Sequence, residues 1–108
     1  MRQAKVYRNT ILIGTLVESD EKDYSFEYEN DYFVNDNLPA VSLTMPKTKK
    51  HYKSDNLFPF FFNMLAEGVN RKIQSRHFQI SENDHFGLLL ATSSIDSIGA
   101  ITVKEVKE

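Results

Sequence analysis

The feature that most constrains the fold is an apolar stretch, residues 57–68, in the middle of the 108-residue chain. On a helical wheel, one face of this stretch carries Leu57, Phe61, Met64 and Leu65. The neighbouring phenylalanines widen the apolar arc to roughly 200°, whereas a surface helix needs only about 100°. We therefore expect one of two arrangements. Either the domain covers this helix on two sides, or part of the helix is a docking surface for another protein.

Polar and turn-forming residues predict where this helix begins and ends. Ser54, Asp55 and Asn56 are all favourable N-cap residues, and Pro59 is tolerated in the first helical turn. Gly68 is the residue type that most often follows the end of a helix. The sequence therefore predicts a helix that begins near residue 56 or 57 and ends at Gly68.

A second helix is predicted over residues 69–78. Its Val69, Ile73 and His77 recur at a spacing of four residues, so they share one face of the helix. The remaining positions are mainly polar. We expect the face with Val69 to point toward the protein and the polar positions to lie outside.

A third, shorter helix is predicted over residues 85–91. Three consecutive leucines in this segment indicate burial on all sides. The Ser-x-x-Asp pattern from Ser81 to Asp84 is close to a capping box and predicts where this helix starts.

The remaining segments show the alternation of apolar and polar residues that is typical of strands. The predicted strands are residues 4–8, 11–17, 24–28, 40–45 and 98–103. The first two are joined by Asn9 and Thr10 and predict a β-hairpin. Strands precede helices along the chain, which predicts a single α+β domain over residues 1–108. We expect a small, mainly antiparallel sheet, formed by the N-terminal hairpin and further strands, packed with about three short helices.

The charge pattern does not favour an anionic partner. The chain has 13 basic and 15 acidic residues, for a net charge of −2. Its one basic concentration, residues 47–53, has two interpretations: a phosphate-binding patch or a solvated loop. The net negative charge favours the loop, so we expect no direct binding to nucleic acid and no binding to a membrane.

The sequence contains no recognisable set of catalytic residues. It has no cysteine, and its four glycines are scattered singly, which excludes thiolate chemistry and a Gly-rich phosphate loop. The three histidines lack metal-binding spacing. No signal-peptide core or membrane-spanning run is present. We expect a cytoplasmic binding or structural module, not an enzyme, with no catalytic, cofactor-binding or metal-binding residues.

Three sequence blocks, in this order, resemble the N-terminal subdomain of the HipA family of toxin kinases. They are VSLTMP at 41–46, SDNLFPFFFNMLAEG at 54–68 and DSIGAI at 96–101. The N-terminal hairpin also fits, so the resemblance covers essentially the whole chain. One departure is Ala66, where the family usually has proline.

In that family the kinase body follows this subdomain, and here the sequence ends at Glu108. We expect the chain to be a complete product. A stand-alone subdomain resembles the HipS-like antitoxins of HipBST systems. The resemblance implies an antitoxin that binds and inhibits a separately encoded HipT-like Ser/Thr kinase toxin, with a HipB-like DNA-binding protein as a candidate third member. The alternative is a structural N-terminal lobe of a longer HipA-type kinase, with no independent activity.

The resemblance also suggests where a kinase would bind, namely at the carboxyl-terminal corner of the central apolar stretch. The candidate partner-binding residues are Phe60, Phe62, Leu65, Ala66, Glu67, Gly68, Val69 and Arg71. For Phe60 and Phe62, a place in the core is an equally good interpretation. For Leu57, Phe61 and Met64, the core is strongly favoured.

Overall fold

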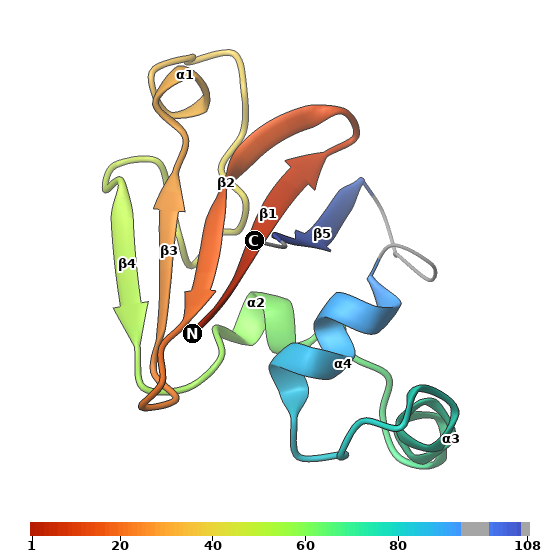
Figure 1. Cartoon of the computed structure of the whole chain (residues 1–108). Coiled ribbons are helices and arrows are strands. Elements are labelled where there is room, and N and C mark those ends of the chain that lie inside the picture. Colours follow the sequence, from red (N-terminus) through yellow and green to blue (C-terminus); the bar gives the residue numbers. More distant parts are fainter. Residues whose placement is uncertain (94–99, 107–108) are drawn as a thin grey trace.

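The fold is described from a computed structural model, which covers residues 1–93 and 100–106. Five strands form one antiparallel sheet in the order β4-β3-β2-β1-β5. The strands are β1 (Arg2–Arg8), β2 (Ile11–Glu18), β3 (Tyr24–Tyr28), β4 (His51–Ser54) and β5 (Ile101–Glu105). The helices are α1 (Asn30–Phe33), α2 (Pro59–Phe62), α3 (Val69–Phe78) and α4 (His85–Thr92). In Figure 1, α1 lies at one end of the sheet, and the other three helices gather at the opposite end. The predicted α+β class and antiparallel sheet are confirmed.

The N-terminal hairpin forms as predicted. Asn9 adopts a φ of 55°, a left-handed conformation that asparagine tolerates in tight turns. The strand predicted over residues 24–28 is also confirmed as β3, with Phe26 and Tyr28 buried. At the carboxyl-terminal end, β5 begins at Ile101 and pairs with β1. Residues 94–99, which include most of the DSIGAI block and the predicted start of the last strand, lie outside the described residues.

The strand predicted over residues 40–45 is wrong. This segment makes one isolated bridge, between Ser42 and Met45, and Leu43 is 99% exposed. Val41 and Met45 are buried because the segment wraps around the hydroxyl group of Tyr28. That hydroxyl accepts a hydrogen bond from the Val41 N–H (3.0 Å) and donates one to the Met45 carbonyl. The apolar residues Val41 and Met45 are therefore buried although the segment does not pair with the sheet.

The fourth strand lies instead in the basic segment that was predicted to be a solvated loop. β4 pairs with β3 at one edge of the sheet, and His51 and Lys53 point to solvent. Charged residues are compatible with an edge strand because its outer side stays hydrated, and they discourage pairing with other chains.

The long helix predicted from residue 56 or 57 to Gly68 is also wrong. α2 begins at Pro59 and has only four residues. A proline disfavours helical geometry in the preceding residue, and Phe58 is accordingly extended with a ψ of 137°. Gly68 is the N-cap of α3, with a φ of 57°, and does not end the central helix.

The core lies between the sheet and the segments that follow β4. From the central apolar stretch, Leu57, Phe58, Phe61 and Leu65 are buried, and Met64 is half-buried against them. The ring of Phe61 has no exposed surface and lies 5.9 Å from the Phe26 ring, measured between centroids. The rest of the protein therefore covers the central stretch mainly on the side that carries the Phe61 ring.

α4 contributes a second part of the core and begins at His85, as predicted. Leu88 and Leu89 are buried, as expected from the leucine run. The N-cap is Asp84, whose carboxylate accepts a hydrogen bond from the Gly87 N–H at 3.1 Å. Ser81 lies in the turn before it and accepts from the Asn83 N–H.

Gly14 is the position at which the sheet tolerates a side chain least. A Cβ atom there would lie 2.2 Å from the carbonyl oxygen of Glu27 and 3.0 Å from the Phe26 ring. We expect Gly14→Ala to lower the free energy of unfolding by about 1–3 kcal/mol, because β2 and β3 must separate locally. Urea unfolding measures this loss. Thr15→Ala, which adds no atoms, is the control; an unchanged midpoint for Gly14→Ala would show that the strands adjust without cost.

Candidate functional site

The connection between α2 and α3 forms a corner at which several of the predicted partner-binding residues meet. Arg71 donates a hydrogen bond from Nε to the carbonyl oxygen of Ala66 at 2.9 Å. Its guanidinium carbon lies 5.3 Å from the centre of the Phe62 ring, within cation–π range. The Phe62 ring also makes an edge contact with His85, at 5.0 Å between centroids. These contacts fix the start of α3 against α2 and α4.

The eight predicted residues differ in how much surface they offer to a partner. Leu65 is 6% exposed and lies in the core. Phe60 and Phe62 are half-buried and pack against the core with one side. The exposed members are Glu67, Gly68 and Val69. A partner at this corner would therefore meet Val69 directly and the outer sides of the phenylalanine rings.

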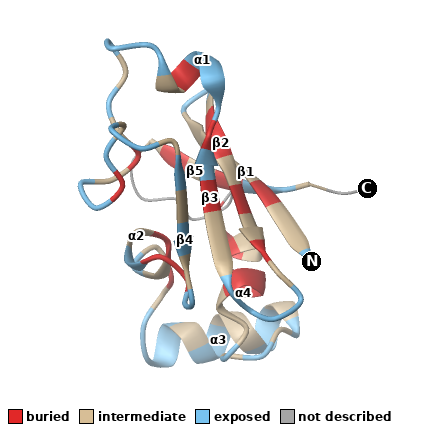
Figure 2. Cartoon of the chain, turned by 90° about the vertical axis from the view of Figure 1, so that its left-hand side faces the viewer, coloured by how far each residue is buried: buried red, intermediate tan, exposed pale blue. Residues whose placement is uncertain are grey.

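α3 has the predicted bounds but the opposite orientation from the one predicted. Val69 is 70% exposed and Ile73 is 59% exposed, so the face expected to point inward points to solvent. The half-buried positions on the other side are Arg71, Gln74, Ser75 and Phe78. α3 has no buried residue, and Figure 2 shows it without any buried segment.

Polar contacts explain why α3 can be held this way. Beside the Arg71 contact, the Ser75 hydroxyl donates to the Ile80 carbonyl, and the Ile80 N–H donates to the Ser75 carbonyl at 3.0 Å. Gln79 adopts a left-handed φ of 58° that ends the helix. The helix is thus fastened near its two ends, and its exposed apolar side chains are not needed to attach it.

A groove of about 510 Å³ opens beside the corner and shares Phe62 with it. It is lined by Lys22, Tyr24, Asp55, Asn56, Leu57, Pro59, Phe62, Asn63 and His85. The lining mixes aromatic, amide and charged side chains. No local pattern in the sequence indicates this groove, because its walls come from three separate parts of the chain, residues 22–24, residues 55–63 and His85.

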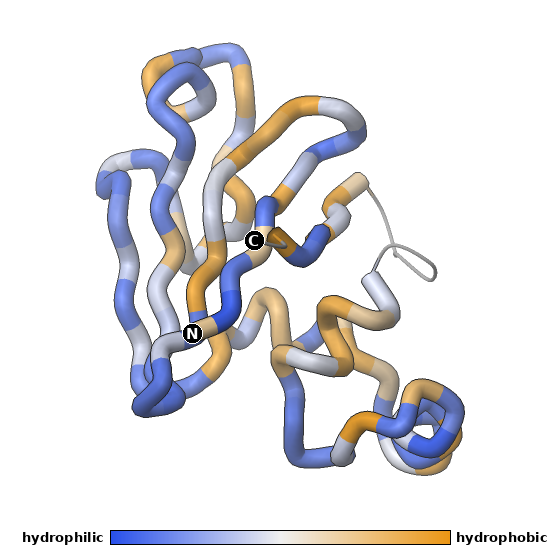
Figure 3. Tube along the Cα trace, viewed as in Figure 1, coloured by the Kyte–Doolittle hydropathy of each residue, from blue (hydrophilic) through white to orange (hydrophobic). Residues whose placement is uncertain are grey.

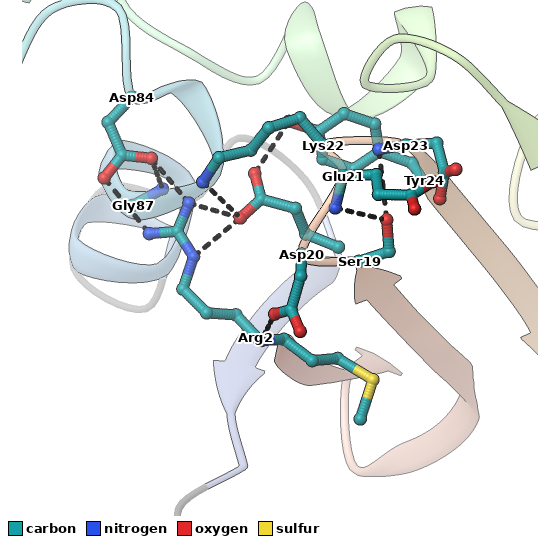
Figure 4. Close-up of polar contacts among 11 residues, drawn as sticks. Arg2, Ser19, Asp20, Glu21, Lys22, Asp23, Tyr24, Asp84 and Gly87 are labelled. Carbon is teal, nitrogen blue, oxygen red and sulfur yellow. Dashed lines mark hydrogen bonds and ion pairs between the residues drawn. The ribbon is translucent and has the colours of Figure 1, made fainter.

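A cluster of charged side chains connects the start of the sheet to α4 (Figure 4). The Arg2 guanidinium donates to the Glu18 carboxylate at 2.6 and 2.9 Å and to the Asp84 carboxylate at 2.7 and 3.1 Å. The Tyr24 hydroxyl donates to the other Glu18 oxygen at 2.8 Å. Because Asp84 also caps α4, this cluster sets the position of α4 relative to β1 and β2.

The cluster changes the acidity of its members. The hydrogen bond from Arg2 holds the pKa of Asp84 below its ordinary value of 3.8. The bond to Asp84 in turn raises the pKa of Arg2, which stays charged. Burial, reinforced by the Glu18 hydrogen bond, raises the pKa of Tyr24 to about 12. These are the shifts expected of a structural ion cluster in which every charge has a partner.

Across residues 1–93 and 100–106, no three His, Cys, Asp or Glu side chains gather as a metal site requires. No helix within those same residues has the length and apolar character needed to cross a membrane.

Comparisons with known proteins agree with the fold and extend over nearly the whole chain. The family model for the HipA N-terminal domain matches residues 4–104. An uncharacterized protein of Haemophilus influenzae is 32% identical over 108 residues, which cover 100% of this chain and 96% of that protein. The solved N-terminal domain of HipA toxin superposes with a TM-score of 0.74 at 27% identity, over 100% of this chain and 95% of that one. The resemblance seen in the sequence is confirmed, and the chain belongs to the HipA N-terminal domain family.

Proposed function

We propose that this protein is a HipS-like antitoxin, which binds a separately encoded HipT-like Ser/Thr kinase and inhibits it. The family match supports a partner of the HipA kinase type. The Haemophilus influenzae relative supports a separate chain, because this single domain accounts for 96% of its length and leaves no room there for a kinase body. In this proposal the protein works in the cytoplasm, has no catalytic residue or cofactor of its own and acts by occupying the kinase.

One observation carries the proposal beyond the family: the exposed apolar surface at the α2–α3 corner. A domain fused to its kinase is held in place by the chain. A separate domain must offset its lost translational and rotational freedom with contacts of its own. Val69, which is 70% exposed, and the exposed parts of the half-buried Phe60 and Phe62 give an apolar and aromatic surface of the kind that anchors such interfaces.

Co-expression with a HipA-type kinase that lacks this domain, encoded beside it, tests the function. We expect the protein to restore growth and to co-purify with the kinase. A HipB-like protein added to the same experiment shows whether inhibition needs a third component. No rescue and no complex would contradict the proposal. A reading frame that continues from this domain into a kinase body would favour the alternative, a structural lobe of a longer enzyme.

The corner itself is tested by introducing a charge where the partner is expected. We expect Val69→Asp and Phe62→Asp each to weaken kinase binding by roughly 10- to 100-fold, because a carboxylate would be desolvated in an apolar contact. Isothermal titration calorimetry measures the change, after circular dichroism has confirmed folding.

Val34→Asp is the matched control for Val69→Asp. Val34 is 71% exposed, almost the same as Val69, but follows α1 at the opposite end of the sheet. The Val34→Asp variant should bind the kinase with the affinity of the unmodified protein. If both corner variants also bind with unchanged affinity, the corner is not the kinase-binding surface.

A further inference from the structure

The exposed outer face of α3 extends beyond the residues that form the α2–α3 corner. Its members, which we call the α3 ridge, are Val69, Lys72, Ile73, Arg76 and His77. All five are exposed. They recur at spacings of three and four residues, so they form one continuous strip along the helix. Figure 3 shows α3 at the edge of the molecule, with its hydrophobic and hydrophilic positions mixed.

The apolar part of the ridge points away from the protein although polar groups lie on the inner side. Val69 and Ile73 are among the most exposed large apolar residues in the described chain, at 70% and 59%. A ten-residue helix has little stability by itself and usually gains it by burying its apolar face. Here that face is left available to another molecule.

The charge on α3 indicates what kind of molecule would bind the ridge. α3 contains Arg71, Lys72 and Arg76, and no acidic residue lies between Val69 and Phe78. α3 is thus a second basic segment, besides residues 47–53, in a protein whose net charge is −2. Two copies of the ridge placed face to face would bring like charges together, which disfavours a second copy of this chain.

We propose that the α3 ridge seats in a groove of the partner kinase that has an apolar floor and an acidic rim. This inference rests on the proposed function and extends it from the corner along the full length of α3. Val69 and Ile73 enter the floor, while Lys72 and Arg76 pair with carboxylates on the rim. Helices bind such grooves through apolar residues spaced four apart, and the rim charges accelerate association.

Association kinetics with the kinase, measured by biolayer interferometry at 50 and 500 mM salt, test the ridge. We expect Lys72→Glu/Arg76→Glu to slow association about tenfold at low salt and to abolish its salt dependence. The control is Lys49→Glu/Lys53→Glu, two exposed lysines on and beside β4. Both double variants move the net charge from −2 to −6, since each reversal changes it by two. Equal association rates for the two double variants, whether fast or slow, would overturn the inference.

The apolar part of the α3 ridge is tested by a second variant with its own matched control. We expect Ile73→Ser to speed dissociation about tenfold, whereas Ile11→Ser, at a 43% exposed isoleucine that begins β2, should leave the dissociation rate unchanged. A kinase that is bound and inhibited normally by every ridge variant would overturn the inference and leave the antitoxin function standing. A kinase that does not bind the unmodified protein would overturn both.

Binding of the α3 ridge to a second copy of this chain or to a membrane would each give a distinct result. A dimer of this protein in sedimentation that Ile73→Ser disrupts would assign the ridge to a second copy. Binding to phosphatidylserine vesicles that the same variant loses would assign it to a membrane surface. Either result, without an effect on kinase binding, would overturn the inference.

Discussion

Phe61→Ala is expected to lower the free energy of unfolding by about 3–5 kcal/mol, the largest loss expected from a single truncation in the central stretch. Phe61 has no exposed surface, and its ring lies within 5.2 to 6.4 Å of the rings of Phe26, Phe58 and Phe60, measured between centroids. Removing it leaves a cavity where the sheet, α2 and the preceding loop meet. A domain of this size is stable by only about 5–15 kcal/mol, so the loss is a large share of the total.

Urea unfolding measures this effect, and Phe60→Ala is the matched control. Phe60 is the neighbouring phenylalanine in α2 and is only half-buried, so its truncation should cost about 1–2 kcal/mol. If Phe61→Ala proves too unstable to measure, Phe61→Leu keeps most of the volume and should still be less stable than the unmodified protein. Equal losses for Phe60→Ala and Phe61→Ala would contradict the division of this stretch into a core side and an outer side.

Short-range sequence signals predicted the parts of the fold that depend on neighbouring residues. The hairpin follows from a two-residue break between alternating strands, and its Asn9 adopts the left-handed conformation that such a turn requires. The bounds of α3 follow in the same way from a glycine before it and a helix-length pattern after it. The start of α2 could also have been predicted, because the residue before Pro59 is disfavoured in a helix.

The orientation of α3 could not be predicted in this way. A spacing of four residues shows that Val69 and Ile73 share a face, but it does not show which way that face points. The direction is set by contacts of Arg71 and Ser75 with residues outside the helix. The usual assumption that apolar residues point inward fails here, and it fails at the proposed binding surface, where such failures are expected.

The ion cluster lies beyond sequence reasoning for a different reason. Arg2 and Asp84 are separated by 82 positions, and the capping pattern that contains Asp84 does not point to Arg2 as a partner. Only the sheet order, with β1 inside the sheet and next to β2, brings the Arg2 side chain to both Glu18 and the N-terminus of α4. The same holds for the groove beside Phe62, whose walls depend on how β3, α2 and α4 pack.

Arg2→Met is expected to lower the free energy of unfolding by about 2–4 kcal/mol at pH 7. The side chain of Glu18 is only 4% exposed, and the substitution leaves its carboxylate without its main cationic partner. Removing one member of a fully buried pair costs roughly 3–5 kcal/mol, and the 29% exposure of Arg2 reduces that figure here. Lys5→Met is the control in the same strand. Lys5 lies on the outer face and donates to the Thr15 hydroxyl, so its loss should cost less than about 1 kcal/mol.

The pH dependence separates the loss of this ion pair from a simple loss of packing. The pKa of Asp84 is lower in the folded protein than its ordinary value of 3.8, so its pair with Arg2 contributes stability that is fully present above about pH 5. That contribution is lost as the pH falls through the lowered folded value. The stability difference between the unmodified protein and Arg2→Met should therefore shrink between pH 5 and about pH 2, as measured by urea unfolding across that range. A difference that stays constant over this range would mean that Arg2 stabilises the fold through its other contacts, with Glu18 and with the Phe86 ring 5.2 Å away, and not through Asp84.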